Sequence, residues 1–275
     1  MNERENLAQW QLEENAAESY ERYFVPPFYA PEAQYIIELA ALGAGEHVLD
    51  LACGTGIVAR CAANKVGANG MVVGLDRNES MLAVARRASV DIISPPIKWQ
   101  RGEAHNTPFP DSTFDIVFCQ QGLHFFPDRS AALRETYRVL APNGRLVLSS
   151  MRPNKHNPEY DLLADVLEQH AGPDAGMMVR STFLPLSIND LRALIKNSGF
   201  QNVRILIGIG PVRYPSVNEF LRREMAGSPL AGQIKSWSDD LFRMIVHDLE
   251  VALEAYIDDD GIIFPAETYF AIAHK

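Results

Sequence analysis

VLDLACGTGIVA, residues 48–59, is the stretch that decides the fold of this chain. Its first half is an apolar run that favours a β-strand and contains one acidic residue, Asp50, and its second half begins a helical pattern. Between them lie Gly54 and Gly56, which lack a Cβ and let the backbone turn tightly and approach a ligand. The stretch predicts a strand, a turn and a helix whose free N–H groups face a ligand.

Strand and helix patterns alternate on the C-terminal side of this stretch. Runs of strand length follow at Met71–Leu75, Ile97–Gln100, Phe114–Cys119 and Arg145–Ser149. Asn78 or Ser80 is placed to cap the helix after the first of these runs, and Asp128 is placed to cap a helix over 129–140. This alternation predicts an α/β fold with a parallel sheet that helices cover on both sides.

The flanking segments predict further helices and two more strands. Helical patterns occur at 4–24, 31–42, 161–170, 187–199 and, interrupted at 227–229, 214–257. Pro26-Pro27 should break the first from the second, and Ser187 with Asp190 forms a capping box. The predicted strands are 203–209 and 268–273.

We predict a single domain over 1–275 with a helical cap. Its predicted parts are an N-terminal helical cap at 1–30, a cofactor-binding core at 31–150, and the remaining strands at 151–275, with helical cap insertions at 151–185 and 211–262.

The composition, 47% hydrophobic and 22% charged, is typical of a globular protein. A net charge of −10 argues against nucleic acid as a partner, because phosphates require clustered Lys and Arg. We find no signal-peptide pattern and no apolar run long enough for a membrane span, so no integral membrane association is expected. Cys53, Cys61 and Cys119 fit buried thiols in a reducing cytoplasm. The oligomeric state stays open, a dimer included.

Residues 54–59 match the dinucleotide pattern G-x-G-x-x-[GA]. Asp76 closes the second predicted strand, about twenty residues after Gly56, where a carboxylate accepts hydrogen bonds from ribose hydroxyls. Both features predict adenosine binding, and nicotinamide cofactors and S-adenosylmethionine share them.

Three features favour S-adenosylmethionine over a dinucleotide. Asp50 would be costly beside a pyrophosphate but helps to hold an ammonium group; its alternative role is to cap the turn. After the third strand, Glu103 can accept from the adenine amine and the Ala104 N–H can donate to a ring nitrogen, unless Glu103 is a solvated loop acid. Residues 120–124 place polar side chains at the end of the fourth strand, where α/β sites form.

In these segments the chain resembles the class I S-adenosylmethionine-dependent methyltransferases, in the UbiE-like, "type 11" branch. The residues responsible are 48–59, 73–81, 102–110, 114–126 and 133–149. Ala52 and Asn143 stand where relatives often have Gly, and Arg77 is an unusual neighbour of the acidic residue. The resemblance implies a Rossmann-like, seven-stranded, doubly wound sheet of order 3-2-1-4-5-7-6 with strand 7 antiparallel.

The resemblance also implies the cofactor contacts, with S-adenosylhomocysteine as product. Ala52, Gly54 and Gly56 would line the methionine and ribose, and Asp76 would hold the ribose. Around the adenine and the sulfonium it implies Arg77, Met81, Glu103, Ala104 and Gln120.

His124 and Tyr20 are the candidate catalytic residues. His124 follows the fourth strand, and an unperturbed pKa of ~6.5 suits a general base, although Phe125 and Phe126 equally suit a packed, structural histidine. Tyr20 belongs to an aromatic cluster that in relatives can fold over the cofactor. No metal site is predicted, and Arg222-Arg223-Glu224 is typical of a solvated helix face.

These observations lead to the hypothesis of methyl transfer, by in-line displacement, to a small lipophilic or aromatic molecule. The predicted cap would supply its pocket. Two alternatives stay open: a catalytically silent S-adenosylmethionine-binding regulatory protein, and an NAD(P) oxidoreductase, against which Asp50 and residues 102–110 argue.

Overall fold

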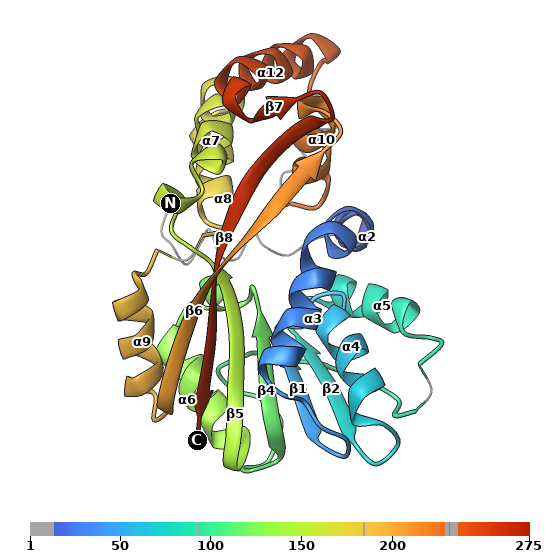
Figure 1. Cartoon of the computed structure of the whole chain (residues 1–275). Coiled ribbons are helices and arrows are strands. Elements are labelled where there is room, and N and C mark those ends of the chain that lie inside the picture. Colours follow the sequence, from blue (N-terminus) through green and yellow to red (C-terminus); the bar gives the residue numbers. More distant parts are fainter. Residues whose placement is uncertain (1–13, 93, 184, 229–230, 232–235) are drawn as a thin grey trace.

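The computed structural model describes residues 14–92, 94–183, 185–228, 231 and 236–275. At its centre is a sheet of order β3-β2-β1-β4-β5-β8-β6, with a short β7 paired to β8 (Figure 1). The strands are β1 His47–Leu51, β2 Met71–Asp76, β3 Lys98–Arg101, β4 Phe114–Gln120, β5 Leu140–Met151, β6 Gln201–Tyr214, β7 Ile257–Asp258 and β8 Gly261–His274. Only β7 was not predicted. Strand β8 runs antiparallel to β5 and β6, so the predicted order with an antiparallel seventh strand is confirmed.

Helices cover both faces of this sheet. On one face, α3 (Ala30–Leu39) and α4 (Ile57–Val66) share a buried cluster with β1, β2 and β4. On the other, α6 (Arg129–Val139) and α9 (Ile188–Asn197) pack through Leu133 and Leu191. The predicted caps are confirmed: Asn78 caps α5 (Glu79–Ala88), Asp128 caps α6, and Ser187 with Asp190 forms the capping box of α9.

The predicted strand, turn and helix are β1, residues 52–56 and α4. The φ angles of Ala52, Gly54 and Gly56 are 57°, 54° and 84°, in the left-handed region that favours glycine. A Cβ on Gly56 would lie 2.2 Å from the Trp99 ring, so packing as well as conformation requires glycine there. The Asp50 carboxylate accepts a hydrogen bond from the Ala59 N–H at 2.9 Å and ties the strand to the helix.

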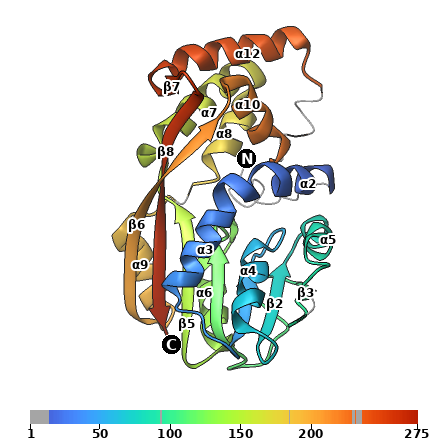
Figure 2. The same cartoon turned by 45° about the vertical axis from the view of Figure 1, so that its right-hand side comes forward.

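Strands β6 and β8 are each 14 residues long, about twice the predicted 203–209 and 268–273. Residues 201–208 of β6 and 268–274 of β8 complete the central sheet. The other halves, 209–214 and 261–267, continue as a two-stranded ribbon as far as the Tyr214–Ile262 pair (Figure 2). Gly208, Gly210 and Pro211 are typical of turns, which is why the sequence pattern ends β6 early. In the structure β6 is an edge strand, where proline is tolerated.

The ribbon enters a helical cap, in the upper part of Figure 1, of which the structure describes four helices. They are α7 Pro158–Ala171, α8 Pro173–Arg180, α10 Val217–Ala226 and α12 Asp239–Ala252. Their inner faces enclose a second hydrophobic core around the fully buried Tyr214, Phe220 and Phe264. The sequence did not predict α8, because its Pro and Gly are typical of loops. Short 3₁₀-helices lie at Leu123–Phe125, Asn154–His156 and Glu254–Tyr256.

The segment before α3 stays helical through the two prolines. Helix α2 (Glu14–Tyr23) is followed by a π-helical turn, η1 (Val25–Tyr29), and then by α3. The predicted break between the two α-helices is confirmed, since α2 ends at Tyr23 and α3 begins at Ala30. The sequence did not predict η1 between them, where Pro26 and Pro27 lie at the start and their missing N–H groups cost little. Leu7 and Trp10, part of the predicted helix over 4–24, lie outside the described residues.

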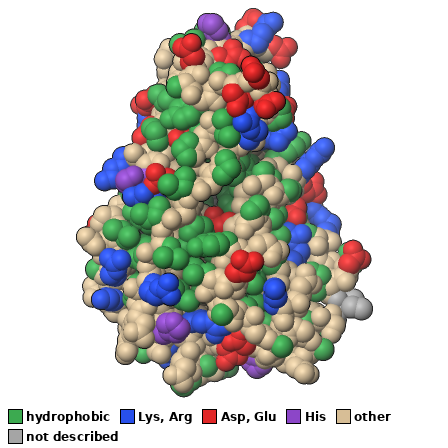
Figure 3. Space-filling model, in the orientation of Figure 1, with side chains coloured by type: hydrophobic (Ala, Val, Ile, Leu, Met, Phe, Trp, Pro, Cys, Tyr) green, Lys and Arg blue, Asp and Glu red, His purple; other side chains and the backbone are tan. Residues whose placement is uncertain are grey.

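Hydrophobic side chains gather across the middle of the face in Figure 3, where the sheet and the cap meet. Ile207 and Ile209 of β6 are 45% and 65% exposed. Cys53 and Cys119 are buried as predicted, whereas Cys61 is only half-buried. Within the described ranges, no helix combines the length and the apolar character that crossing a bilayer would take.

Candidate active site

A cavity of about 800 Å³ lies between the carboxyl ends of β1, β2 and β4 and the cap. Its wall includes all but two of the residues that the sequence singled out, namely Tyr20, Ala52, Gly54, Asp76, Arg77, Met81, Glu103, Ala104, Gln120 and His124. Asp50 and Gly56 do not line it. The opposite wall comes from the cap and is largely apolar, with Phe28, Tyr160, Met178, Val212, Glu224 and Met225.

Asp76 is the anchor of the glycine turn. One carboxylate oxygen accepts a hydrogen bond from the Gly54 N–H at 2.8 Å, and the other accepts one from the Asn78 N–H at 2.8 Å. Burial raises the pKa of Asp76, and these two donors oppose that effect. Asp76 lines the cavity, and each carboxylate oxygen can accept a further hydrogen bond, so this pair of acceptors fits the two hydroxyls of a ribose.

The neighbouring wall has the chemistry of a purine site. The side chain of Met81 is buried, Ala104 packs against the sheet core, and both residues line the cavity. At the rim, the Arg77 Nε lies 3.9 Å from a Glu103 carboxylate oxygen, and both side chains are partly exposed. Apolar surface for the ring faces and an acidic acceptor for an exocyclic amine therefore lie side by side, as adenine requires.

Asp50 and Gly56 lie behind the turn rather than in the cavity. Asp50 is 1% exposed, and burial raises its pKa to about 7. Its hydrogen bond from the Ala59 N–H matches the alternative role predicted for Asp50, which is to cap the turn. This position does not imply a direct contact between Asp50 and the ammonium group of a cofactor. Gly56 acts through its positive φ and its contact with Trp99.

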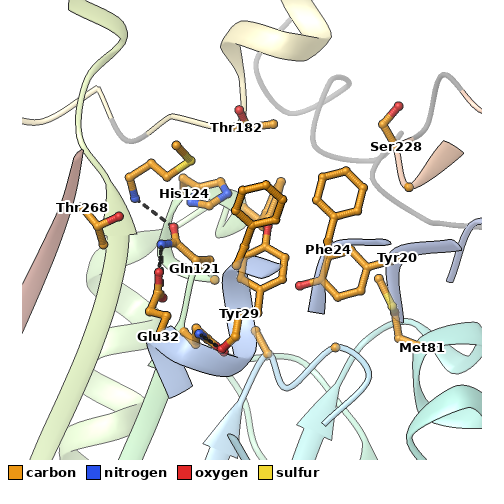
Figure 4. Close-up of a pocket in the computed structure, with 18 of the residues that line it drawn as sticks. Tyr20, Phe24, Tyr29, Glu32, Met81, Gln121, His124, Thr182, Ser228 and Thr268 are labelled. Carbon is orange, nitrogen blue, oxygen red and sulfur yellow. Dashed lines mark hydrogen bonds between the residues drawn. The ribbon is translucent and has the colours of Figure 1, made fainter. Parts of the chain in front are cut away.

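Three aromatic rings project into the middle of the cavity, between Met81 and His124 (Figure 4). The Tyr20 ring centroid is 5.8 Å from that of Phe24 and 5.1 Å from that of Tyr29, with the rings nearly parallel. A Cβ on Gly54 would lie 3.9 Å from the Tyr20 ring, so this ring covers the glycine turn. Burial raises the pKa of Tyr20 and of Tyr29, which keeps both hydroxyls protonated.

A polar network forms the floor of the cavity beside the rings (Figure 4). Gln120 donates to the Tyr29 carbonyl at 2.9 Å, and Gln121 donates to Glu32 at 2.9 Å while accepting from the Met151 N–H. Ser149 also donates to Glu32, whose pKa burial raises. The sequence analysis missed Glu32, because an acid in the first turn of a helix is common and gives no local signal of a site.

His124 lines the cavity but is 4% exposed. Its ring centroid lies 3.9 Å from that of Phe125, and its Nδ1 lies 3.4 Å from the Ser150 hydroxyl. Burial, aided by the charge of Arg129, lowers the pKa of His124 to about 3. A base this weak is poorly suited to accept a substrate proton at neutral pH, so the packing favours the structural alternative.

The buried neutral state of His124 predicts a specific pH dependence of stability. The folded pKa of about 3 lies below the ~6.5 of an unfolded histidine, so protons favour the unfolded chain as the pH falls from 6.5. We expect this group to cost the wild type about 2 kcal/mol of unfolding free energy between pH 7 and pH 5, and His124→Gln to lack that loss. Urea unfolding of both proteins at these pH values measures the difference, and parallel pH profiles would contradict it.

Glu224 is a second site residue that the sequence analysis missed. Its Oε1 accepts hydrogen bonds from the hydroxyls of Tyr214 at 2.5 Å and Tyr160 at 3.4 Å, and burial raises its pKa to about 7. The predicted solvated helix face is therefore wrong at this position. A signal did exist: Glu224 follows the core residues Phe220 and Leu221 by one helical turn, on the buried face of α10.

His170 and Asp258 each pair with another side chain. His170 Nε2 is 2.7 Å from an Asp248 carboxylate oxygen, and Asp258 pairs with Arg213 at the β7–β8 turn. In the parts of the chain that the structure describes, no group of three or more His, Cys, Asp or Glu side chains is arranged to hold a metal ion.

Residues 49–148 match the family described as a methyltransferase domain. The chain is 34% identical over 181 residues to the ubiquinone/menaquinone biosynthesis C-methyltransferase UbiE of Cronobacter sakazakii, covering 62% of this chain and 72% of that protein. It is 39% identical over 128 residues, 46% of this chain, to the 2-phytyl-1,4-naphtoquinone methyltransferase of Synechococcus elongatus, and spans about half (53%) of that relative's length.

A solved structure shares the fold over the whole chain. The phosphoethanolamine N-methyltransferase 2 of Haemonchus contortus, in complex with S-adenosylhomocysteine, aligns with a TM-score of 0.61 at 19% identity, covering 100% of this chain and 60% of that one. The groups at the carboxyl edge of the sheet fit an adenosine cofactor, and the sequence relationship indicates a methyltransferase that uses one. The chain belongs to the class I S-adenosylmethionine-dependent methyltransferases, in the UbiE-like branch.

Proposed function

We propose that this protein transfers the methyl group of S-adenosylmethionine to a small, lipophilic ring compound that carries hydroxyl groups, of the quinol class. One observation carries the proposal: a single cavity joins the glycine turn and Asp76 to a largely apolar, aromatic cap wall. The relatives support the acceptor class, since one is named for a naphthoquinone and another for ubiquinone and menaquinone biosynthesis.

The chain holds and orients the cofactor, which when bound supplies a methyl group activated by its sulfonium charge. Ala52 and the Gly54 backbone would line its methionine part, Asp76 would accept hydrogen bonds from the ribose hydroxyls, and Glu103 would accept one from the adenine amine. Arg77, Met81 and Ala104 flank the base, and Gln120 faces the sulfonium side. Orientation of this kind is worth about 7–11 kcal/mol in favourable intramolecular reactions, so the transfer needs little beyond alignment.

The cap binds the acceptor and excludes water. The rings of Tyr20, Phe24 and Tyr29 line the middle of the cavity, where the cofactor end meets the acceptor end. Met178 and Met225 offer adaptable apolar contacts to a flexible side chain. In this proposal, residues 31–150 bind the cofactor. Residues 1–30 and the segments within 151–275 that leave the sheet serve the acceptor.

Calorimetry followed by a turnover assay tests the proposal. We expect S-adenosylmethionine and S-adenosylhomocysteine to bind, and S-adenosylhomocysteine to be released only when 2-prenyl-1,4-naphthohydroquinone is added under anaerobic conditions. Absence of cofactor binding would contradict the proposal at its base. Cofactor binding without turnover over a panel of ring acceptors would favour the regulatory alternative, and NADH binding would favour the oxidoreductase.

A further inference from the structure

We infer that Glu224 binds a ring hydroxyl of the acceptor and removes its proton before methyl transfer. The inference rests on the proposed function and concerns the cap rather than the cofactor turn. It depends on where Glu224 lies, on its hydrogen bonds and on the charges around it.

Glu224 comes from α10 in the cap, the part of the molecule to which we assign the acceptor. Its side chain lines the cavity, and its negative charge is one of the causes that raise the pKa of Tyr29. Tyr29 in turn lies one ring, that of Tyr20, from the glycine turn. A ring compound held between the rings and the cap wall can therefore reach the carboxyl with one substituent.

The hydrogen bonds of Glu224 fix one oxygen and leave the other for a ligand. Tyr214 and Tyr160 both donate to Oε1, and burial raises the pKa of both tyrosines so that they stay protonated donors. Among the described residues, none donates a hydrogen bond to Oε2. The carboxyl is thus held in one orientation with a free acceptor, which is the arrangement that a hydroxyl donor needs.

No described cation lies within ion-pair distance of Glu224. Its helix neighbours are engaged elsewhere: Arg223 pairs with Glu219, and the Arg222 guanidinium lies 4.2 Å from the centroid of the Phe242 ring. Burial raises the pKa of Glu224 to about 7. Among the described residues, the titratable side chains that interact with this carboxyl are Tyr29, Tyr160 and Tyr214. A carboxyl of this kind is ionised in part at neutral pH and is basic enough to accept a proton there.

The proton step is simple. The O–H bond of the acceptor breaks, its proton forms an O–H bond on Oε2 of Glu224, and the electron pair stays on the acceptor oxygen. That pair makes the oxygen, and the ring carbons conjugated with it, more nucleophilic toward the methyl carbon. The proton leaves Glu224 for bulk water once the product has gone, which restores the carboxylate.

Binding of 1-naphthol and of 1-methoxynaphthalene, measured by calorimetry with S-adenosylhomocysteine present, tests the inference. The two probes share a ring system, and only the naphthol donates a hydrogen bond. Above pH 7 we expect the wild type to bind the naphthol about tenfold more tightly, because hydrogen bonds to a charged acceptor are strong. This preference should fall as the pH drops below 7 and the carboxyl is protonated.

Glu224→Gln should lose most of the preference and all of its pH dependence. Glu219→Gln, a neutralised acid on the same helix whose side chain is 42% exposed, should keep both. If the wild type does not prefer the naphthol, or if Glu224→Gln keeps the preference and its pH profile, the inference is wrong. If Glu224→Gln does not fold, Tyr214→Phe replaces it and should shift the midpoint of the pH profile, since it removes the 2.5 Å donor.

Failure of the proposed function is detected separately. A wild type that does not bind S-adenosylhomocysteine contradicts the methyl-transfer proposal itself. Normal S-adenosylhomocysteine binding together with an unaltered naphthol preference in Glu224→Gln contradicts only the role of Glu224.

Discussion

Asp76→Ala is expected to weaken the binding of S-adenosylhomocysteine by about 10²-fold or more. The substitution removes two charge-assisted acceptors for the ribose hydroxyls, each worth about 1.5–3 kcal/mol. It also removes the partner of the Gly54 N–H, so the turn that follows β1 loses its anchor. Isothermal titration calorimetry on both proteins gives the ratio of dissociation constants.

Asp91→Ala is the matched control, because Asp91 is an exposed acid shortly after α5. It should bind S-adenosylhomocysteine with the wild-type affinity. A folded Asp76→Ala protein, checked by circular dichroism, that binds as tightly as this control would remove the main support for the cofactor site.

Phe264→Ala is expected to lower the free energy of unfolding by about 3–5 kcal/mol, the usual cost of truncating a buried phenylalanine. Phe264 is 1% exposed at the outer end of β8. Its ring centroid lies 5.4 Å from that of Phe220 and 5.7 Å from that of Tyr160, so its loss leaves a cavity among aromatic rings that cannot close around it. Urea unfolding followed by circular dichroism measures the change.

Met244→Ala on α12 provides the comparison, since Met244 is 55% exposed and should change stability by no more than about 0.5 kcal/mol. At urea concentrations too low to unfold it, the Phe264→Ala protein should still bind S-adenosylhomocysteine, because the glycine turn belongs to the central sheet. A destabilisation no larger than that of Met244→Ala would mean that the cap core contributes little to folding.

The sequence predicted the central sheet well because its signals are local. Each of the first five strands is followed by its own turn residue or helix cap, as Asp76 and Asn78 illustrate for β2 and α5. The outer halves of strands β6 and β8 are stabilised by each other, through pairs such as Gly210 with Ala266 and Pro211 with Pro265. A long-range partner overrides the local preference of glycine and proline for turns, and no window of sequence contains that information.

The site divides in the same way. The half that we propose for the cofactor comes from strand ends, and motifs of a few residues were enough to single out Asp76 and Glu103, which both line the cavity. Its acceptor half is assembled from η1, α7, β6 and α10, and Glu224 gains its surroundings only when Tyr160 and Tyr214 fold against it. Asp50 shows the limit in the cofactor half, because the same strand-end position serves either a ligand or the turn behind it.

The continuous β6–β8 ribbon also bears on how acceptor preference can change among relatives. The cap wall at Val212 and the core residue Tyr214 inherit their register from the sheet, without an intervening loop to absorb a difference in length. Insertion of one residue into β6 ahead of Arg213 would turn Tyr214 outward and bring Arg213, now paired with Asp258 at the surface, into the aromatic core. Diversification of this pocket should therefore proceed by substitution, or by exchange of both strand halves as a single cassette.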